Sequence, residues 1–548
     1  MALERIKMPL LIILFGLGLG VIGDLLFYEK PLGISAPIFT AAILVALLVL
    51  VVAERTAVTW ENSWLAAPIL FFAVMYAVRA SPTVRFWNFA AALALLALLS
   101  NRLAGEPLIK LNLAGYLGVV LESSVVSAFL AAPLIQKGWA ALSSTSQGGG
   151  RRTARRVFVG ALIALPFLCV FTILFAAADL VFGQYVADVL RLFEDLPDLI
   201  GQILFTLALA WVLIGGLAYA LSRMTESRTI FERPMVINDR ADAAQPAAGS
   251  EQANDEDAAR EVEEAVPQPA PSRGIRELLG HVEVAVVLFS VDALFFVFVV
   301  IQFAALFGGE TFLRAHALTY SEYARRGFFE LLTVSLITLG LVLSLDFVTR
   351  RETPAQANVF LIGSGLMIGM VVIILASAFY RMALYELAYG FTRLRVHTHV
   401  FMIWLAILFS AFLWMLVVGR TRWFAHGVLI VSIGALATLN LLNPDAFIAR
   451  QNIARYQRGE ELDVAYLGAL SADTAPMLFS LLLDAPDPDI REEAGEWLHF
   501  QLNRLDRRQE QAGWPSYHFS INRAYRMLDL NRGLIETYDA PERGWYID

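Results

Sequence analysis

The stretch MPLLIILFGLGLGVIGDLLF, residues 8–27, decides the fold class of this chain. It holds one charged side chain, that of Asp24, near its end. An α-helix rises about 1.5 Å per residue, so a stretch of this length crosses a hydrocarbon core of about 30 Å. Because the backbone in lipid must satisfy its own hydrogen bonds, the stretch predicts a transmembrane helix.

Apolar blocks of this length recur along the chain. Of the 548 residues, 58% are hydrophobic and 17% are charged, below the share of about 25% that is usual in soluble domains. Strands of alternating polarity, typical of a transmembrane barrel, do not occur. The sequence therefore predicts an all-α, polytopic bundle of about 12 spans. The expected spans are residues 8–27, 36–53, 62–79, 86–101, 110–136, 156–182, 198–222, 280–307, 328–348, 358–380, 398–418 and 424–442.

Changes in composition divide the chain into four expected parts. Residues 1–222 hold about seven spans, and residues 276–443 hold about five. Between them, residues 223–275 are polar, acidic and without apolar periodicity, which predicts a disordered linker. Residues 444–548 lack a block of membrane length and show amphipathic helices near 444–458, 475–483, 490–505 and 517–530. They predict a small extramembrane helical domain.

Basic residues indicate the orientation. Arginines cluster at residues 151–156 and 223–233, and such loops lie in the cytoplasm. The linker is then cytoplasmic and the C-terminal domain extracytoplasmic. Counting back over five spans places the N-terminus outside. It returns to the cytoplasm if residues 110–136 are re-entrant, and the sequence leaves both alternatives open.

Several motifs carry a family resemblance, the most specific being Tyr-x-Glu-Tyr-Ala-Arg-x-Gly-Phe at residues 320–328. The others are Gly23–Phe27, Asp292–Phe298 with Gln302, Leu306–Gly309, Arg381, Tyr385, Tyr389–Gly390, Arg393 and Asn443–Arg450. Together they resemble the bacterial membrane-protein family catalogued as domain of unknown function forty-one-seventy-three, with its sister forty-one-fifty-three. The resemblance implies a multi-pass protein of the bacterial cytoplasmic membrane and leaves its activity open.

Two polar segments are expected at the outer membrane surface. The first contains Tyr320, Glu322, Tyr323, Arg325 and Arg326, and the second, Phe379–His399, contains Arg381, Tyr385 and Arg393 at helical spacing. These side chains are either interfacial anchors, with the second segment an amphipathic helix lying in the interface, or a binding site for an anionic headgroup or carboxylate.

Ionisable residues near the middle of a span form the third candidate site. Glu122 and Asp292 lie near the middle of their blocks, and the blocks hold no equally deep lysine or arginine. Charge at the bilayer centre costs at least about 2.5 kcal/mol, so such residues usually face the bundle interior. Either they are neutral acids sealing a packing site, with Gln302 as a hydrogen-bond partner, or they pass protons or cations.

No catalytic motif occurs in the sequence, which favours a non-enzymatic role. His397 and His399 are two positions apart, the single cysteine is Cys169, and neither pattern predicts a metal site or a cofactor. Nothing indicates nucleic-acid binding. Besides the lipid bilayer, an envelope protein or an anionic lipid at the outer face is the expected partner. The preferred hypothesis is a sensor, scaffold or envelope-assembly protein. The alternatives are a transporter whose midspan carboxylates couple to protons or cations, and a membrane-embedded enzyme acting on lipid or cell-wall precursors.

Overall fold

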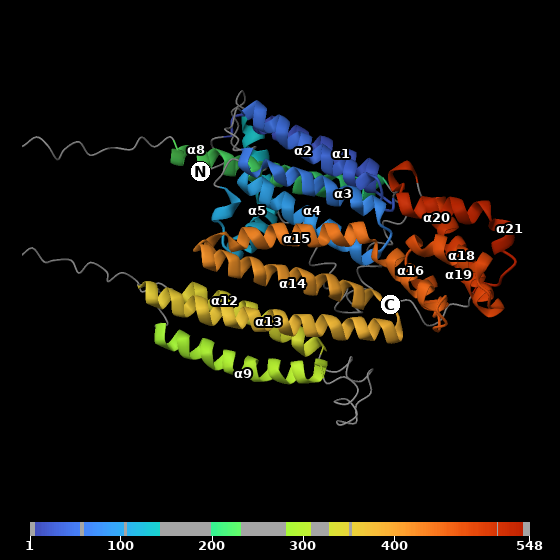
Figure 1. Cartoon of the computed structure of the whole chain (residues 1–548). Coiled ribbons are helices and arrows are strands. Elements are labelled where there is room, and N and C mark those ends of the chain that lie inside the picture. Colours follow the sequence, from blue (N-terminus) through green and yellow to red (C-terminus); the bar gives the residue numbers. More distant parts are fainter. Residues whose placement is uncertain are drawn as a thin grey trace, which may run out of the picture.

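The computed structural model describes residues 6–54, 60–103, 107–142, 199–231, 281–307, 328–349, 353–511 and 513–540. Every element in these ranges is a helix, which confirms the all-α class (Figure 1). Nine of the described helices are long and apolar enough to cross a membrane. The expected span at 156–182 lies outside the described residues.

The helices form an N-terminal group, a C-terminal group and a C-terminal domain at one end of the long helices (Figure 1). The N-terminal group consists of α1 (Pro9–Phe27), α2 (Ser35–Glu54), η2 (Trp60–Leu65), α3 (Ala66–Val78), α4 (Pro82–Arg102), η3 (Leu108–Lys110), α5 (Leu113–Leu142) and α8 (Leu199–Phe231). The C-terminal group consists of α9 (His281–Phe307), α12 (Phe328–Val348), α13 (Pro354–Tyr389), α14 (Arg393–Val418), η5 (Thr421–Trp423) and α15 (Phe424–Leu442). The C-terminal domain consists of α16 (Pro444–Tyr456), α17 (Val464–Ala469), η6 (Ala472–Thr474), α18 (Ala475–Asp484), α19 (Pro488–Gln511), η7 (Trp514–Ser516), α20 (Phe519–Leu530) and α21 (Arg532–Ile535).

Small residues bring α1 and α8 into close contact. A Cβ atom added at Gly16 would lie 2.3 Å from Cγ1 of Ile214, and one added at Gly20 would lie 2.7 Å from Cβ of Ala210. Glycines four residues apart let two helix backbones approach closely, and this contact stabilises membrane helix pairs. The α8 helix continues to Phe231, beyond its expected end at residue 222.

A buried amide pair joins the N-terminal and C-terminal groups. Asn88 of α4 donates to Oδ1 of Asn440 of α15 at 2.8 Å, and Asn440 donates back to Asn88 at 2.6 Å. Both side chains are fully buried. At the start of α15, His426 contacts the Tyr116 hydroxyl of α5 at 3.1 Å. Since buried amides need partners, these contacts fix the register between the two groups.

The α5 helix has both ends at the same end of the bundle. Near its start, Tyr116 contacts His426, which lies in the first turn of α15. Near its end, Lys137 donates to the carbonyl of Ile6, just before α1 begins. The opposite ends of α1 and α15 are the ones that adjoin the C-terminal domain. The apolar length of α5 therefore does not carry the chain across the bundle, in agreement with the re-entrant alternative.

The C-terminal domain packs around its own apolar core. Fully buried leucines of α18 and α19, among them Leu478, Leu498 and Leu502, meet the apolar face of α20. Helices predicted from the sequence near 444–458, 475–483, 490–505 and 517–530 correspond to α16, α18, α19 and α20. Figure 1 shows this domain at one end of the long helices.

The expectation of one interfacial helix at Phe379–His399 is wrong. The α13 helix runs on to Tyr389, the chain turns at Gly390 with a φ of 78°, and a new helix begins at Arg393. With 36 residues, α13 is about 54 Å long, more than a hydrocarbon core requires. Its last turn contacts α16 of the C-terminal domain, where Arg455 donates to the Leu387 carbonyl at 2.9 Å.

Candidate functional site

An ion pair joins the C-terminal domain to α14. Nε and Nη2 of Arg393 donate to the two carboxylate oxygens of Asp445 at 2.8 and 2.7 Å, and the Ser471 amide donates at 3.1 Å. The Asp445 side chain is 0% exposed. Burial alone would raise the pKa of Asp445. The hydrogen bonds and positive charge of Arg393, together with the hydrogen bonds from Ser471, instead hold this pKa below its usual value. The pair is a bidentate, charge-assisted contact.

The turn between α13 and α14 is fixed by two side chains of α16. Asn452 accepts from the Phe391 amide at 2.7 Å and donates to the Phe391 carbonyl at 2.9 Å. Arg455 donates to the carbonyl of Leu387 at 2.9 Å, which satisfies a free acceptor at the end of α13. A Cβ atom at Gly390 would lie 2.7 Å from Arg455, so only glycine fits this turn.

The same domain also contacts the N-terminal group, at the turn between α3 and α4. Asp473 accepts from the amide of Ala80 at 2.9 Å, and the Ser520 hydroxyl donates to the Val78 carbonyl at 2.6 Å. Nε2 of His518 lies 3.2 Å from the Arg79 carbonyl oxygen. The C-terminal domain is therefore fastened to both groups of helices.

Of the outer-surface residues predicted from the sequence, some lie in this junction and some cannot be placed. Tyr320, Glu322, Tyr323, Arg325 and Arg326 are outside the described residues. Arg381 is buried within α13, and the Arg395 guanidinium lies 4.1 Å from the ring centroid of Tyr385. Arg393 belongs to the next helix and is engaged by Asp445, so the expected single stripe is divided between two helices.

The midspan residues are also separated. Glu122 forms an ion pair with Arg223 of α8, which corrects the expectation that no cation lies at its depth. Glu122 is in the middle of the apolar block 110–136. It nevertheless lies near one end of the bundle, because α5 does not cross the bundle from one end to the other. Asp292 on α9 is 6% exposed and neither carboxylate oxygen has a hydrogen-bond partner among the described residues. The side chain of Gln302 lies outside the described residues.

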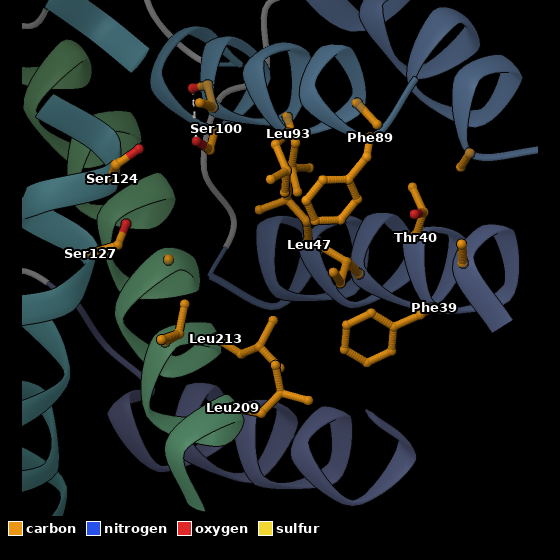
Figure 2. A pocket seen from close by; sticks show the side chains of 18 of the residues that line it. Phe39, Thr40, Leu47, Phe89, Leu93, Ser100, Ser124, Ser127, Leu209 and Leu213 are labelled. Carbon is orange, nitrogen blue, oxygen red and sulfur yellow. Dashed lines mark hydrogen bonds between the residues drawn. The ribbon is translucent and has the colours of Figure 1, made fainter. Parts of the chain in front are cut away.

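A cavity of about 620 Å³ lies inside the N-terminal group. Its walls come from α1, α2, α3, α4, α5 and α8, and they are almost entirely aliphatic and aromatic. In Figure 2, Leu47, Leu93 and Leu213 face the same space from α2, α4 and α8. The hydroxyl-bearing Ser100, Ser124 and Ser127 gather at one end of it. Neither Glu122 nor Asp292 lines this cavity.

The other end of the cavity has a basic rim. Tyr76 and Leu32 line the cavity, and Nη2 of Arg85 donates to the Tyr76 hydroxyl at 2.9 Å and to the Leu32 carbonyl at 3.3 Å. The Arg85 guanidinium also lies 4.5 Å from the centroid of the Tyr76 ring. The cavity and its rim were missed by sequence reasoning. The alanines and serines that leave the space open are ordinary span residues, and no local pattern marks them.

Comparison with known proteins places these elements in one family. The family model described as Domain of unknown function (DUF4153) matches residues 66–481, from the start of α3 into α18. It is the sister family of the resemblance stated above, and membership in the family forty-one-seventy-three stays a prediction. Searches of the curated proteins and of the solved structures found no match.

Proposed function

We propose that this chain, which belongs to the DUF4153 family, is a lipid-binding protein of the bacterial cytoplasmic membrane. The observation that carries the proposal is the cavity of about 620 Å³ between α2, α4 and α8. Ligand pockets measure about 300–1,000 Å³ and are predominantly apolar. An almost wholly apolar space inside a membrane suits a hydrocarbon chain, because that chain needs no hydrogen bonds from its walls.

The side of the bundle supports access from the bilayer. Phe89 and Leu93 both line the cavity, and they are 50% and 51% exposed. In a membrane these exposed faces meet lipid tails. A chain can therefore slide between the helices from the side without passing through water or through the C-terminal domain.

The distribution of basic residues supports an orientation with the C-terminal domain outside the cytoplasm. Arginine clusters at residues 151–156 and 223–233 follow α5 and the transmembrane part of α8, and both helices end away from that domain. The start of α8 adjoins Tyr28, at the domain's end of the bundle. By the positive-inside rule the far end is cytoplasmic. Because α5 starts and ends there, the N-terminus is cytoplasmic as well.

In this orientation the C-terminal domain is a fixed outer cover. Its contacts with Ala80 and with Phe391 hold it on both groups of helices, beside the basic rim. A rigid position favours a role in presenting one surface to an envelope partner, as expected of an assembly or scaffold protein.

Lipid binding is tested by narrowing the cavity. Ala97 and Ala90 are both half-buried residues of α4, but only Ala97 lines the cavity. We expect Ala97→Phe to lower binding of monooleoylglycerol, a neutral single-chain lipid, by tenfold or more in native mass spectrometry of the purified protein. Ala90→Phe serves as the matched control, and gel filtration of both variants checks the fold. Retention of the lipid by Ala97→Phe at the wild-type level would refute the proposal.

A further inference from the structure

The rim of the cavity carries positive charge that has no carboxylate partner among the described residues. Arg85 lies in the first turn of α4, where the helix dipole is itself positive. Its Nη2 donates to two neutral oxygens, and its buried Nε has no hydrogen-bond partner among the described residues. No ion pair to a described carboxylate is formed by this guanidinium.

A second guanidinium belongs to the part of the C-terminal domain that adjoins the end of α3. Arg508 of α19 is half-buried, and its buried Nη2 has no hydrogen-bond partner among the described residues. Burial lowers the pKa of Arg508, and the positive charges of Arg85 and Arg504 lower it further. Gln509, the next residue of α19, donates to Asn522 of α20 at 2.7 Å, and Ser520 of α20 donates to the Val78 carbonyl at 2.6 Å. This end of α19 therefore adjoins the end of α3, where Tyr76 lines the cavity.

The neighbouring histidine does not add a charge to this rim. Burial, Arg85 and Arg508 lower the pKa of His518 to about 3, so its imidazole is neutral at physiological pH. The Asp473 carboxylate of the junction accepts from the Ala80 amide. Burial lowers the pKa of Arg79, and the charge of Asp473 offsets part of that shift. The positive charges of Arg85 and Arg508 repel each other, and an anion bound to both would offset that repulsion.

We propose that Arg85 and Arg508 bind the phosphate group of an anionic amphiphile whose hydrocarbon chain occupies the cavity. The inference rests on the proposed lipid-binding function, and it adds the class of headgroup. A guanidinium offers several N–H donors in a plane that matches phosphate oxygens, and the two unpartnered N–H groups are donors of this kind. The headgroup would lie at the extramembrane end of the bundle, between the start of α4 and α19, and the chain would extend along α2 and α4.

The ligand pair that tests this inference differs by one phosphate. Monooleoylglycerol and 1-oleoyl lysophosphatidic acid share the same chain and glycerol, so the ratio of their affinities reports the headgroup alone. For the wild-type protein in detergent micelles we expect lysophosphatidic acid to bind tenfold or more tightly. Arg508→Gln is the informative variant, because the buried Nη2 of Arg508 donates to no described residue. It should abolish the preference and leave monooleoylglycerol binding unchanged.

The neighbouring Arg507 supplies the matched control. It lies on the same helix and is exposed, so Arg507→Gln removes the same charge away from the rim and should keep the wild-type preference. Equal preference in Arg508→Gln and wild type would overturn the headgroup site. Inorganic phosphate is titrated alone by calorimetry. If it binds in an Arg508-dependent way while the lipid pair shows no preference, the site serves a soluble anion and the lipid form of the proposal is wrong.

The two proposals fail separately. If Ala97→Phe leaves binding of both lipids intact, the chain does not occupy the cavity, whatever the headgroup preference. If Ala97→Phe weakens both lipids but Arg508→Gln changes nothing, the cavity binds a chain and the rim does not select phosphate.

Discussion

Acidification should loosen the C-terminal domain through one buried histidine. Nε2 of His518 lies 3.2 Å from the Arg79 carbonyl oxygen, and its Nδ1 accepts from the Ile521 amide at 3.4 Å. These contacts fix the neutral imidazole with its hydrogen on Nε2. Burial, together with the positive charges of Arg85 and Arg508, lowers the pKa of His518 to about 3. A proton added to Nδ1 would also face the N–H donor of Ile521.

The size of the effect follows from the difference between two pKa values. Once the domain separates from the bundle, the imidazole regains an ordinary pKa of about 6.5. A group whose pKa is lowered in the docked state stabilises that state above its free pKa, and the stabilisation is lost as the pH falls toward the docked value. Between pH 7.5 and pH 5 the loss is about 1.36 kcal/mol for each of about 1.5 pH units, or about 2 kcal/mol. The open fraction should rise about 30-fold.

Hydrogen exchange measures this opening directly. The Ala80 amide donates to Asp473 across the junction, so its protection factor, corrected for the intrinsic pH dependence of exchange, reports docking. We expect protection at Ala80 to fall about 30-fold from pH 7.5 to pH 5 in the wild-type protein. In His518→Gln, where the side chain still offers an acceptor to Ile521, protection should be independent of pH. His499→Gln, in the same domain but bonded to Tyr538, should behave like wild type. An equal pH response in His518→Gln would refute the reasoning.

Two further outcomes are expected. Asp445→Ala leaves the Arg393 guanidinium without its carboxylate in a largely buried junction, which costs about 3 kcal/mol. Hydrogen exchange at the Phe391 amide, which bonds across the junction, should therefore rise about 100-fold. The apolar double variant Arg393→Met with Asp445→Leu should cost less, and a double variant as damaging as Asp445→Ala would contradict this. A periplasm-active phosphatase fused after the C-terminal domain should be active, and one fused before α9 inactive; the reverse pattern would invert the orientation.

Length and polarity were enough to predict the long helices, because a span is a local property of sequence. The direction of a helix is not local. The α5 block has the hydropathy of a span, yet Tyr116 and Lys137 at its two ends both contact the same end of the bundle. Glu122 was therefore predicted to be deep in the membrane, although it pairs with Arg223 near one end of the bundle. Hydropathy measures whether a helix fits in lipid and carries no information on how it is tilted.

The junction depends on residues that are far apart in sequence. Ala80 contacts Asp473 across 393 positions, and Asn88 contacts Asn440 across 352. The sequence predicts a helix start at Asn443-Pro-Asp445, and the same residues carry part of the family resemblance. Their geometry shows what the three residues do: Asn443 has a φ of 51°, the proline begins α16 at N1, and Asp445 follows in the first turn, facing Arg393. A single sequence shows the helix start but not the arginine that requires it.

The position of the cavity relative to the junction explains how a fixed C-terminal domain is compatible with the proposed lipid site. The domain is held at the ends of α3 and α4, where Val78 and Ala80 bond to it, and Arg85 lies one turn farther along α4. A ligand entering from the side of the C-terminal domain would have to break those contacts. Phe89 and Leu93, one and two turns deeper on the same helix, are exposed on the side of the bundle, so a chain can enter from the bilayer while the junction stays closed. Lowering the pH to loosen the domain should therefore change access of soluble anions to Arg508 more than it changes binding of the hydrocarbon chain.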